Sequence, residues 1–269
     1  MGLKGRLSLP FYQVDAFTDE VFSGNPAGVC LLKDPLEDQI MQQIAAENNL
    51  AETAFIRTDL SPYQIRWFTP TVEVDLCGHA TLAAAYVLFN QKKSDDVIRF
   101  QSLRSGELIV IKNGEHLTLD FPVDKIIPIG IKNDWIEAIG TPILEAYKGR
   151  TDLILRVENE SIVKEIQPDF VNIKRWPYVG VIVTAKGSDV DFVSRFFGPA
   201  VGIDEDPVTG SAHTSLVAFW SKKLKKTKLS ARQESKRQGN LLCEINGDRA
   251  LITGNAQLYL KGEIYVPYH

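Results

Sequence analysis

The sequence contains few cysteines, and this scarcity excludes two kinds of structural cross-link. Only three of the 269 residues are cysteine, namely Cys30, Cys77 and Cys243. They are odd in number and none belongs to a C-x-x-C pair, which argues against a disulfide framework and against a structural zinc site. Free thiols of this kind are typical of a reducing compartment. We therefore expect a cytoplasmic protein.

Long apolar runs and a strong excess of charge are also missing. The purest apolar run, residues 82–89, is far shorter than the roughly 20 residues that a membrane-spanning helix needs. The net charge is only −4 and suggests no polyanionic partner. The basic stretch 222–237 lacks the aromatic residues that stack on bases, so we interpret it as a solvated helix end and loop. We expect neither a membrane nor a nucleic acid as partner.

Signatures of nucleotide, metal and classical hydrolase sites are absent as well. The chain has no G-x-x-x-x-G-K-[ST], no G-x-G-x-x-G and no G-x-S-x-G segment. Its four histidines lack the spacing of metal ligands. His213 has acidic neighbours at 204–206, but we interpret these as part of a solvated loop. We therefore expect no metal and no cofactor.

Short strands with a few helices among them fill the chain. Alternating apolar residues between turn residues predict the strands, and helical spacing of apolar residues predicts the helices. Asp34 is expected to cap the first helix, with Pro35 in its first turn. The predicted strands are 11–17, 29–32, 50–57, 65–69, 97–102, 107–112, 116–121, 142–147, 152–157, 179–185, 241–245, 249–253 and 256–260. The predicted helices are 34–49, 80–89, 133–139 and 212–224.

One short pattern occurs twice. Cys77-Gly78-His79 and Thr209-Gly210-Ser211 each precede an apolar helix, and the two glycines are 132 positions apart, close to half of the chain. A duplicated α/β unit would explain this repeat and would let the two helix starts face each other. Chance would also explain it, because glycine before a helix is common.

Two residues of the first half are candidates for acid/base chemistry. Glu52 lies within an apolar strand, and burial raises the pKa of a carboxyl group toward the range that a general acid/base needs. The alternative is that Glu52 points to solvent. His79 follows Gly78, where an imidazole can exchange protons or donate a hydrogen bond to a substrate. The alternative is a capping or packed histidine.

Asp206 and Ser211 flank the repeated glycine of the second half. Backbone N–H groups at a helix start, together with a serine hydroxyl, make a site for a carboxylate or enolate oxygen. The alternative is ordinary N-capping of the helix by Asp206 or Ser211. A nucleophilic Ser211 with His79 and Asp206 would instead indicate a hydrolase.

Taken together, the motifs resemble the PhzF family of phenazine-biosynthesis-like isomerases. They occur in the family's order and extend over nearly the whole chain. The matching segments are Val14-Asp15-Ala16-Phe17, Gly24-Asn25-Pro26-Ala27-Gly28-Val29, Leu50-Ala51-Glu52-Thr53-Ala54-Phe55, Phe68-Thr69-Pro70 with Glu73, Leu76-Cys77-Gly78-His79-Ala80-Thr81, Glu205-Asp206-Pro207-Val208-Thr209-Gly210-Ser211-Ala212-His213, and Gln233-Glu234-Ser235-Lys236-Arg237 followed by Gly239.

The resemblance implies an α+β protein with the diaminopimelate epimerase-like fold. Two pseudo-symmetric halves would each wrap a curled, mostly antiparallel sheet around a central helix. The first half would cover residues 1–123, joined by the last strand at about 260–269, and the second half would cover residues 124–259. The active site would lie in the cleft between them, and the family expectation is a homodimer.

The resemblance also implies a function. The chain would be a cofactor-independent isomerase that transfers a proton, and so shifts a double bond, on a small carboxylate-bearing metabolite. Glu52 would be the acid/base, and the other catalytic positions would be His79, Asp206 and Ser211. The positions expected to bind substrate are Gly78, Gly210, Thr209, Cys77 and Asn25.

One departure from the wider fold narrows this chemistry. Racemases and epimerases of the fold use two cysteines, one at each glycine turn, whereas this chain has Cys77 at the first turn and Thr209 at the second. Two opposed thiols are therefore impossible, and Cys77 is interpreted as a small packed residue. Two other functions stay open: the hydrolase described above, and a non-enzymatic binding protein that kept the fold.

Overall fold

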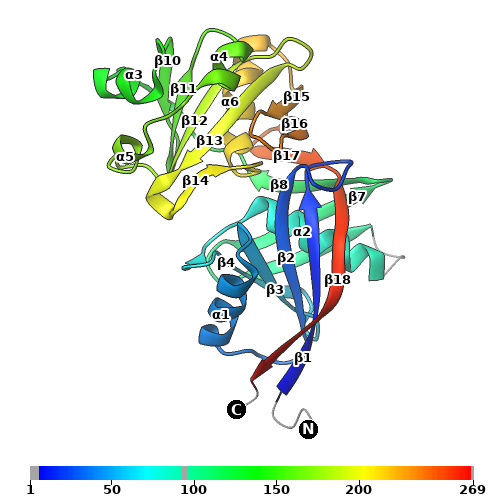
Figure 1. Cartoon of the computed structure of the whole chain (residues 1–269). Coiled ribbons are helices and arrows are strands. Elements are labelled where there is room, and N and C mark those ends of the chain that lie inside the picture. The colour runs from blue at the N-terminus through cyan, green and yellow to red at the C-terminus, as the bar shows by residue number, and fades with distance from the viewer. Residues whose placement is uncertain (1–5, 92–95, 268–269) are drawn as a thin grey trace. The chain divides into compact units, whose positions relative to one another are not determined.

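The computed structural model of the chain describes residues 6–91 and 96–267 (Figure 1). They divide into two compact units. The first unit is built from the described residues within 1–22, 26–119 and 255–269, and the second from residues 23–25 and 120–254. No helix among the described residues is long and apolar enough to cross a membrane.

The first unit holds two helices, and its strands include the first and the last strand of the chain. Its elements are β1 (Arg6–Ala16), β2 (Asn25–Leu32), α1 (Asp38–Asn48), β3 (Glu52–Arg57), β4 (Tyr63–Phe68), β5 (Glu73–Val74), α2 (Gly78–Gln91), β6 (Val97–Ser102), β7 (Gly106–Asn113) and β18 (Ala256–Pro267). Strand β8 (His116–Pro122) leads from the first unit into the second.

The second unit contains more helices than the first but has a similar arrangement of strands. Its elements are β9 (Ile127–Ile129), α3 (Asn133–Ile139), β10 (Glu145–Lys148), β11 (Asp152–Arg156), α4 (Glu160–Glu165), α5 (Phe170–Ile173), β12 (Gly180–Lys186), β13 (Phe192–Gly198), the 3₁₀ turn η1 (Pro199–Val201), β14 (Ile203–Asp206), α6 (Ala212–Leu224), β15 (Lys228–Gln233), β16 (Gly239–Asn246) and β17 (Arg249–Gly254).

The two units repeat one succession of strand pairings. In the first unit β2 pairs parallel with β3, β3 antiparallel with β4, β4 parallel with β6, and β6 antiparallel with β7. In the second unit β11 pairs parallel with β12, β12 antiparallel with β13, β13 parallel with β15, and β15 antiparallel with β16. The long helix comes at the same step in both. Duplication, not chance, therefore explains the repeated glycine pattern.

The long helices are apolar because the core of each unit forms around them. In α2 eleven of the fourteen residues are buried, including Leu82 and Leu88, so this helix shows no amphipathic face. In α6 nine residues are buried, and its polar end at Lys222 and Lys223 reaches solvent. Truncation of a side chain as deeply buried as Leu82 to alanine costs about 2–5 kcal/mol of unfolding free energy.

The start of the first helix was predicted wrongly. Helix α1 begins at Asp38, and its N-cap residue Glu37 is extended and makes no side-chain capping bond. Asp34 and Pro35 therefore do not open the helix. Leu36 instead packs against the apolar cluster around Met41 and Ile44, and this contact keeps the segment before the helix extended.

The basic stretch 222–237 also differs from its prediction as a helix end and loop. Residues 228–233 form strand β15, whose alternate residues Leu229, Ala231 and Gln233 are buried. The strand pairs with β13 on one side and with β16 on the other. The segment forms a strand although few of its residues are apolar, because a half-buried strand needs inward-facing residues only at alternate positions.

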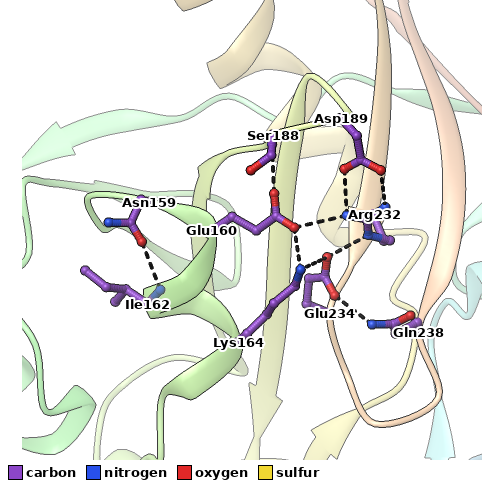
Figure 2. A network of polar contacts seen from close by, with 9 residues as sticks. All are labelled: Asn159, Glu160, Ile162, Lys164, Ser188, Asp189, Arg232, Glu234 and Gln238. Atoms are coloured by element: carbon purple, nitrogen blue, oxygen red, sulfur yellow. Dashed lines mark hydrogen bonds and ion pairs between the residues drawn. The ribbon is translucent and has the colours of Figure 1, made fainter.

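Many basic side chains of this stretch are neutralised within the second unit. Arg232 donates to Glu234 at 2.6 Å, to Glu160 at 3.0 Å and to both carboxylate oxygens of Asp189 at 2.8 and 2.9 Å (Figure 2). Lys164 donates to Glu160 at 2.5 Å in the same network. Because the Glu234 side chain is fully buried, removal of Arg232 would leave it with Lys164 at 3.6 Å as its cationic neighbour and would lower the stability of the unit.

Candidate active site

A buried carboxylate–imidazole pair lies in the first unit. Glu52 is the first residue of β3, and His79 is the second residue of α2. His79 Nε2 lies 3.2 Å from Glu52 Oε2, and the two side chains are only 4% and 12% exposed. Glu52 therefore does not point freely to solvent, as one reading of the sequence allowed.

One oxygen of Glu52 lacks a hydrogen bond. Glu52 Oε2 is buried, and among the described residues no hydrogen-bond donor meets it with proper geometry. The nearest charged group is His79, whose Nε2 lies 3.2 Å away. Buried polar atoms in native proteins are nearly always satisfied, and an exception calls for a functional explanation. An unsatisfied carboxylate oxygen is suited to accept a proton from a bound molecule.

Cys77 completes this group. Its Sγ lies 3.5 Å from His79 Nδ1, so the imidazole lies between a thiol and a carboxylate. Burial, followed by the charge of Glu52, raises the pKa of the Cys77 thiol to about 11. Cys77 is therefore a neutral thiol near pH 7 and a poor proton acceptor.

The environment of His79 favours its charged form. Burial lowers the pKa of His79, but the interactions of the ring with Cys77 and Glu52 raise it, and the pKa lies well above the usual 6.5. Because the Cys77 thiol keeps its proton, we assign the stabilisation of the imidazolium to the Glu52 carboxylate. The imidazole is thus protonated near neutral pH.

The start of α2 adds hydrogen-bond donors to this group. Gly78 is the first residue of the helix and is buried, and the first N–H groups of a helix have no partner within it. Thr81 fastens the turn, since its Oγ1 donates to the Cys77 carbonyl at 2.6 Å. A negatively charged substrate group would be favoured here by the helix dipole.

In the second unit the predicted residues form a buried polar cluster. Asp206 is the last residue of β14 and is only 7% exposed. Its Oδ1 accepts a hydrogen bond from Asn25 Nδ2 at 2.7 Å, and its Oδ2 accepts one from Thr209 Oγ1 at 2.5 Å. Asp206 is therefore held in one orientation rather than acting as a simple helix cap.

Ser211 stands at the N-cap position of α6 without capping it. Its backbone is helical and its hydroxyl makes no capping hydrogen bond. The residue is half-buried, whereas Gly210 before it is buried. The hydroxyl is therefore available to a ligand.

His213 corrects the interpretation of its surroundings as a solvated loop. It lies in α6 and is completely buried, and the neighbouring Asp206 is buried too. Its Nδ1 contacts the Thr209 carbonyl at 2.8 Å, which requires the tautomer with the proton on Nδ1. Burial lowers the pKa of His213 to about 4, so the ring is neutral and fixes the turn before the helix.

Gln233 is a residue whose role the sequence did not reveal. It is fully buried in β15. Its Oε1 accepts from the Thr209 N–H at 2.8 Å, and its Nε2 donates to the Asp206 carbonyl at 2.7 Å. Gln233 thus fastens both ends of the 206–209 segment. It lies in the Gln233-Glu234-Ser235 motif, which was the only signal that pointed to it.

The second unit has no counterpart of Glu52. Strand register places Gly180 at the start of β12 where Glu52 starts β3, one residue before the pairs Val181–Phe197 and Thr53–Phe68. A Cβ on Gly180 would lie 2.1 Å from Cζ of Phe196. The Phe196 ring therefore occupies the place of a side chain, and this unit carries no acid/base at that position.

The first unit also contains the one group with metal-ligand chemistry among the described residues. Donor atoms of Glu52, Cys77 and His79 all lie within 4.8 Å of one another. The thiol and the imidazolium both carry protons near pH 7, and a metal would have to displace them. The absence of a metal stays a prediction.

The nine predicted site residues thus form two groups, one in each unit. Glu52, Cys77, Gly78 and His79 lie together in the first unit. The second group consists of Asn25, Asp206, Thr209, Gly210 and Ser211. The joining of both groups in one cleft stays a prediction.

Comparison with known proteins gives one consistent answer. The model of the phenazine biosynthesis-like protein family (PhzC-PhzF) matches residues 14–262. A protein of Pseudomonas aeruginosa named as an uncharacterized isomerase is 48% identical over 263 residues, which cover 97% of this chain and all of that protein.

Solved structures agree with this result. A phenazine biosynthesis protein of the PhzF family from Enterococcus faecalis has 50% sequence identity and a TM-score of 0.93, over 97% of this chain and all of that one. A hydroxyproline epimerase from Agrobacterium vitis, at 10% identity, has a TM-score of 0.62 over 99% of this chain and 94% of its own. The predicted diaminopimelate epimerase-like fold is therefore confirmed.

Proposed function

The chain belongs to the phenazine biosynthesis-like protein family, and we propose that it is an isomerase that moves a proton within a small carboxylate-bearing metabolite without a cofactor. The name of the Pseudomonas aeruginosa relative supports the general class of reaction. The observation that carries the proposal is the buried Oε2 of Glu52, without a hydrogen bond among the described residues and 3.2 Å from His79 Nε2.

The reaction needs one acid/base that works twice. The Glu52 carboxylate takes a proton from a carbon of the substrate, and the electron pair of the broken C–H bond enters the conjugated system. The neutral Glu52 carboxyl then returns that proton to another carbon, so the double bond shifts. No electron is gained or lost overall. The His79 ring, with its Nε2 3.2 Å from Glu52 Oε2, orients the carboxylate for the first step.

Negative charge that develops on the substrate during proton transfer is stabilised by hydrogen-bond donors that are already in position. Helix-start N–H groups beside Gly78 and Gly210, with the Ser211 hydroxyl, are suited to stabilise an enolate-like oxygen. In the second unit Asn25 and Thr209 hold Asp206, and we assign Asp206 to orienting the substrate. The neutral Cys77 thiol packs against His79 and is given no proton-transfer role.

A screen in deuterated water tests the proposal. Small acids are incubated with the protein, and mass spectrometry follows deuterium incorporation into carbon positions. We expect label in at least one compound with wild-type protein and a loss of about 10²–10⁴-fold in rate for Glu52→Gln, in a variant that still folds and unfolds cooperatively. Cys77→Ser is the matched control and should keep most of the activity.

The other outcomes separate the competing functions. Binding without any label would support a non-enzymatic binding protein. Covalent labelling of folded protein at Ser211 by a fluorophosphonate probe would support a hydrolase. Full activity of Glu52→Gln on a substrate found by the screen would refute Glu52 as the base.

A further inference from the structure

The second unit contains an open cavity that none of the nine predicted site residues lines. One wall is formed at the turn that joins β10 to β11, and the other by the segment that leads into β12. The volume of the cavity is about 430 Å³. Pockets that bind small molecules typically have volumes of about 300–1,000 Å³, so this cavity is large enough for a small organic ligand.

Hydrogen bonds hold the two walls of the cavity in place. The Val179 N–H of one wall donates to the Thr151 carbonyl of the other at 2.9 Å. Asp124 fastens the turn, because its Oδ2 accepts from the Arg150 backbone N–H at 3.1 Å and from Ser215 Oγ at 2.7 Å. The walls are therefore ordered before a ligand arrives, and binding does not have to bear the entropic cost of ordering them.

Glycine at position 149 allows this arrangement. A Cβ on Gly149 would lie only 2.5 Å from Asp124 Oδ2. That carboxylate cannot easily move aside, because Arg150 and Ser215 both bond to it. Any larger residue would push the turn away from Asp124. The sequence of the turn is thus suited to a wall that is fixed at this position.

Two aromatic rings belong to the wall that leads into β12. Trp176 and Tyr178 line the cavity, and both residues are half-buried. Both rings pack on Trp135, which is only 1% exposed and whose ring centroid lies 6.2 Å from that of Trp176 and 6.4 Å from that of Tyr178. Because the buried ring supports them, the two rings offer a fixed apolar surface to a flat ligand.

The wall at the turn carries two cations whose charge is not balanced. Lys148 and Arg150 line the cavity, and both residues are exposed. Neither side chain forms an ion pair with another described residue, whereas Arg156 on β11 pairs with Glu145 at 2.5 Å. No carboxylate of the described part of the chain lines the cavity. An anionic group would therefore be attracted into it.

We propose that this cavity binds a small molecule in which a flat ring carries an anionic group, either a phosphate monoester or a carboxylate. The ring lies against Trp176 and Tyr178, and the anionic group accepts charge-assisted hydrogen bonds from Lys148 and Arg150. Both walls are needed, since one offers apolar area and the other offers charge. The proposal involves none of the groups assigned to proton transfer, so it stands or falls independently of the proposed reaction.

Ring-bearing anions and their separate halves test the proposal on the full chain. In protein labelled with ¹⁵N at the tryptophan side chains, Trp176 is identified as the indole signal that is lost in Trp176→Phe. We expect phenyl phosphate or benzoate to shift this signal saturably, with a dissociation constant at least about tenfold lower than that of inorganic phosphate or phenol. A preference for phenyl phosphate or for benzoate identifies the anionic group.

Removal of one charge from the wall is the second part of the test. Arg150→Gln keeps the backbone N–H that bonds to Asp124 and loses only the guanidinium, and we expect it to weaken binding of the preferred probe about tenfold. The matched control Lys222→Gln neutralises an exposed lysine at the end of α6 and should bind like wild type. A Trp176 signal that neither ring-bearing anion shifts would overturn the proposal. Equally tight binding of inorganic phosphate, or unchanged binding by Arg150→Gln, would overturn it as well.

Discussion

The two units share a plan but differ in chemistry at equivalent positions. Each contains the same succession of strand pairings and one long buried helix. In the first unit β3 starts with Glu52, whereas in the second β12 starts with Gly180, beside which the Phe196 ring leaves no room for a side chain. Duplication supplied two similar scaffolds, and only one of them carries the carboxylate.

The turns before the long helices show the same division. His79 in the first unit corresponds to Ser211 in the second. The equivalent position therefore carries a titratable ring in the first unit and, in the second, a hydroxyl that does not titrate in the physiological range. The second unit instead holds Asp206 by hydrogen bonds from Asn25 and Thr209. The comparison supports the proposal that proton transfer belongs to the first unit and that the second unit binds and orients the substrate.

The largest effect among the remaining predictions separates His79 from Ser211. His79→Gln should lower the rate of deuterium incorporation about 10²–10³-fold, because the cationic ring 3.2 Å from Glu52 Oε2 is lost. Ser211→Ala removes one hydrogen bond among several donors and should lower the rate about tenfold. Initial rates of both variants on the screened substrate measure this. A larger loss for Ser211→Ala would reverse the assigned roles of the two units.

A second prediction concerns the carbonyl group just before each repeated glycine. In each unit a side chain of the following helix contacts this carbonyl, but the side chain differs. Thr81 donates to the Cys77 carbonyl in the first unit, and His213 contacts the Thr209 carbonyl in the second. The pKa of His213 is lowered to about 4 by burial. The unfolded chain therefore binds a proton as the pH falls below 6.5, while the native histidine does not until about pH 4.

Stability of the second unit should consequently fall between pH 6.5 and pH 4, by up to about 3 kcal/mol. Hydrogen exchange at several pH values should show this loss in the second unit and little of it around α2. In His213→Asn the same pH dependence should be weaker, whatever the stability of the variant at neutral pH. Equal acid sensitivity of both units in wild type would contradict this account.

The smallest expected effect concerns metals. Dialysis against a chelator should leave the rate unchanged, because the proposed step uses the proton-binding groups of Glu52 and His79 and no metal. Activity before and after dialysis measures this. Loss of activity that returns on addition of zinc would show instead that Glu52, Cys77 and His79 serve as ligands.

The sequence pointed to most of the candidate site residues because they lie in short motifs. Glu52, His79, Asp206 and Ser211 all lie beside strand ends or helix starts whose glycines and apolar neighbours are visible in one dimension. Gln233 was not assigned a role because its contacts with Thr209 and Asp206 join segments 24 or more residues apart. The exclusion of a side chain at Gly180 by Phe196 likewise appears only once β12 and β13 are paired.

The fold was predicted well where periodicity is strong and poorly where it is weak. The apolar run of α2 was placed within two residues at each end. Strand β15 was missed because lysines conceal its alternating buried residues, and the strand 256–260 proved to extend to Pro267.

The central claim is that one carboxylate carries one proton between two carbons. The most direct measurement starts from substrate deuterated at the donor carbon and follows single turnovers in ordinary water by mass spectrometry. The account predicts that part of the deuterium reaches the acceptor carbon, because the buried Glu52 carboxyl returns the atom that it removed. Product with no transferred deuterium at any turnover, formed equally fast by Glu52→Gln, would contradict it.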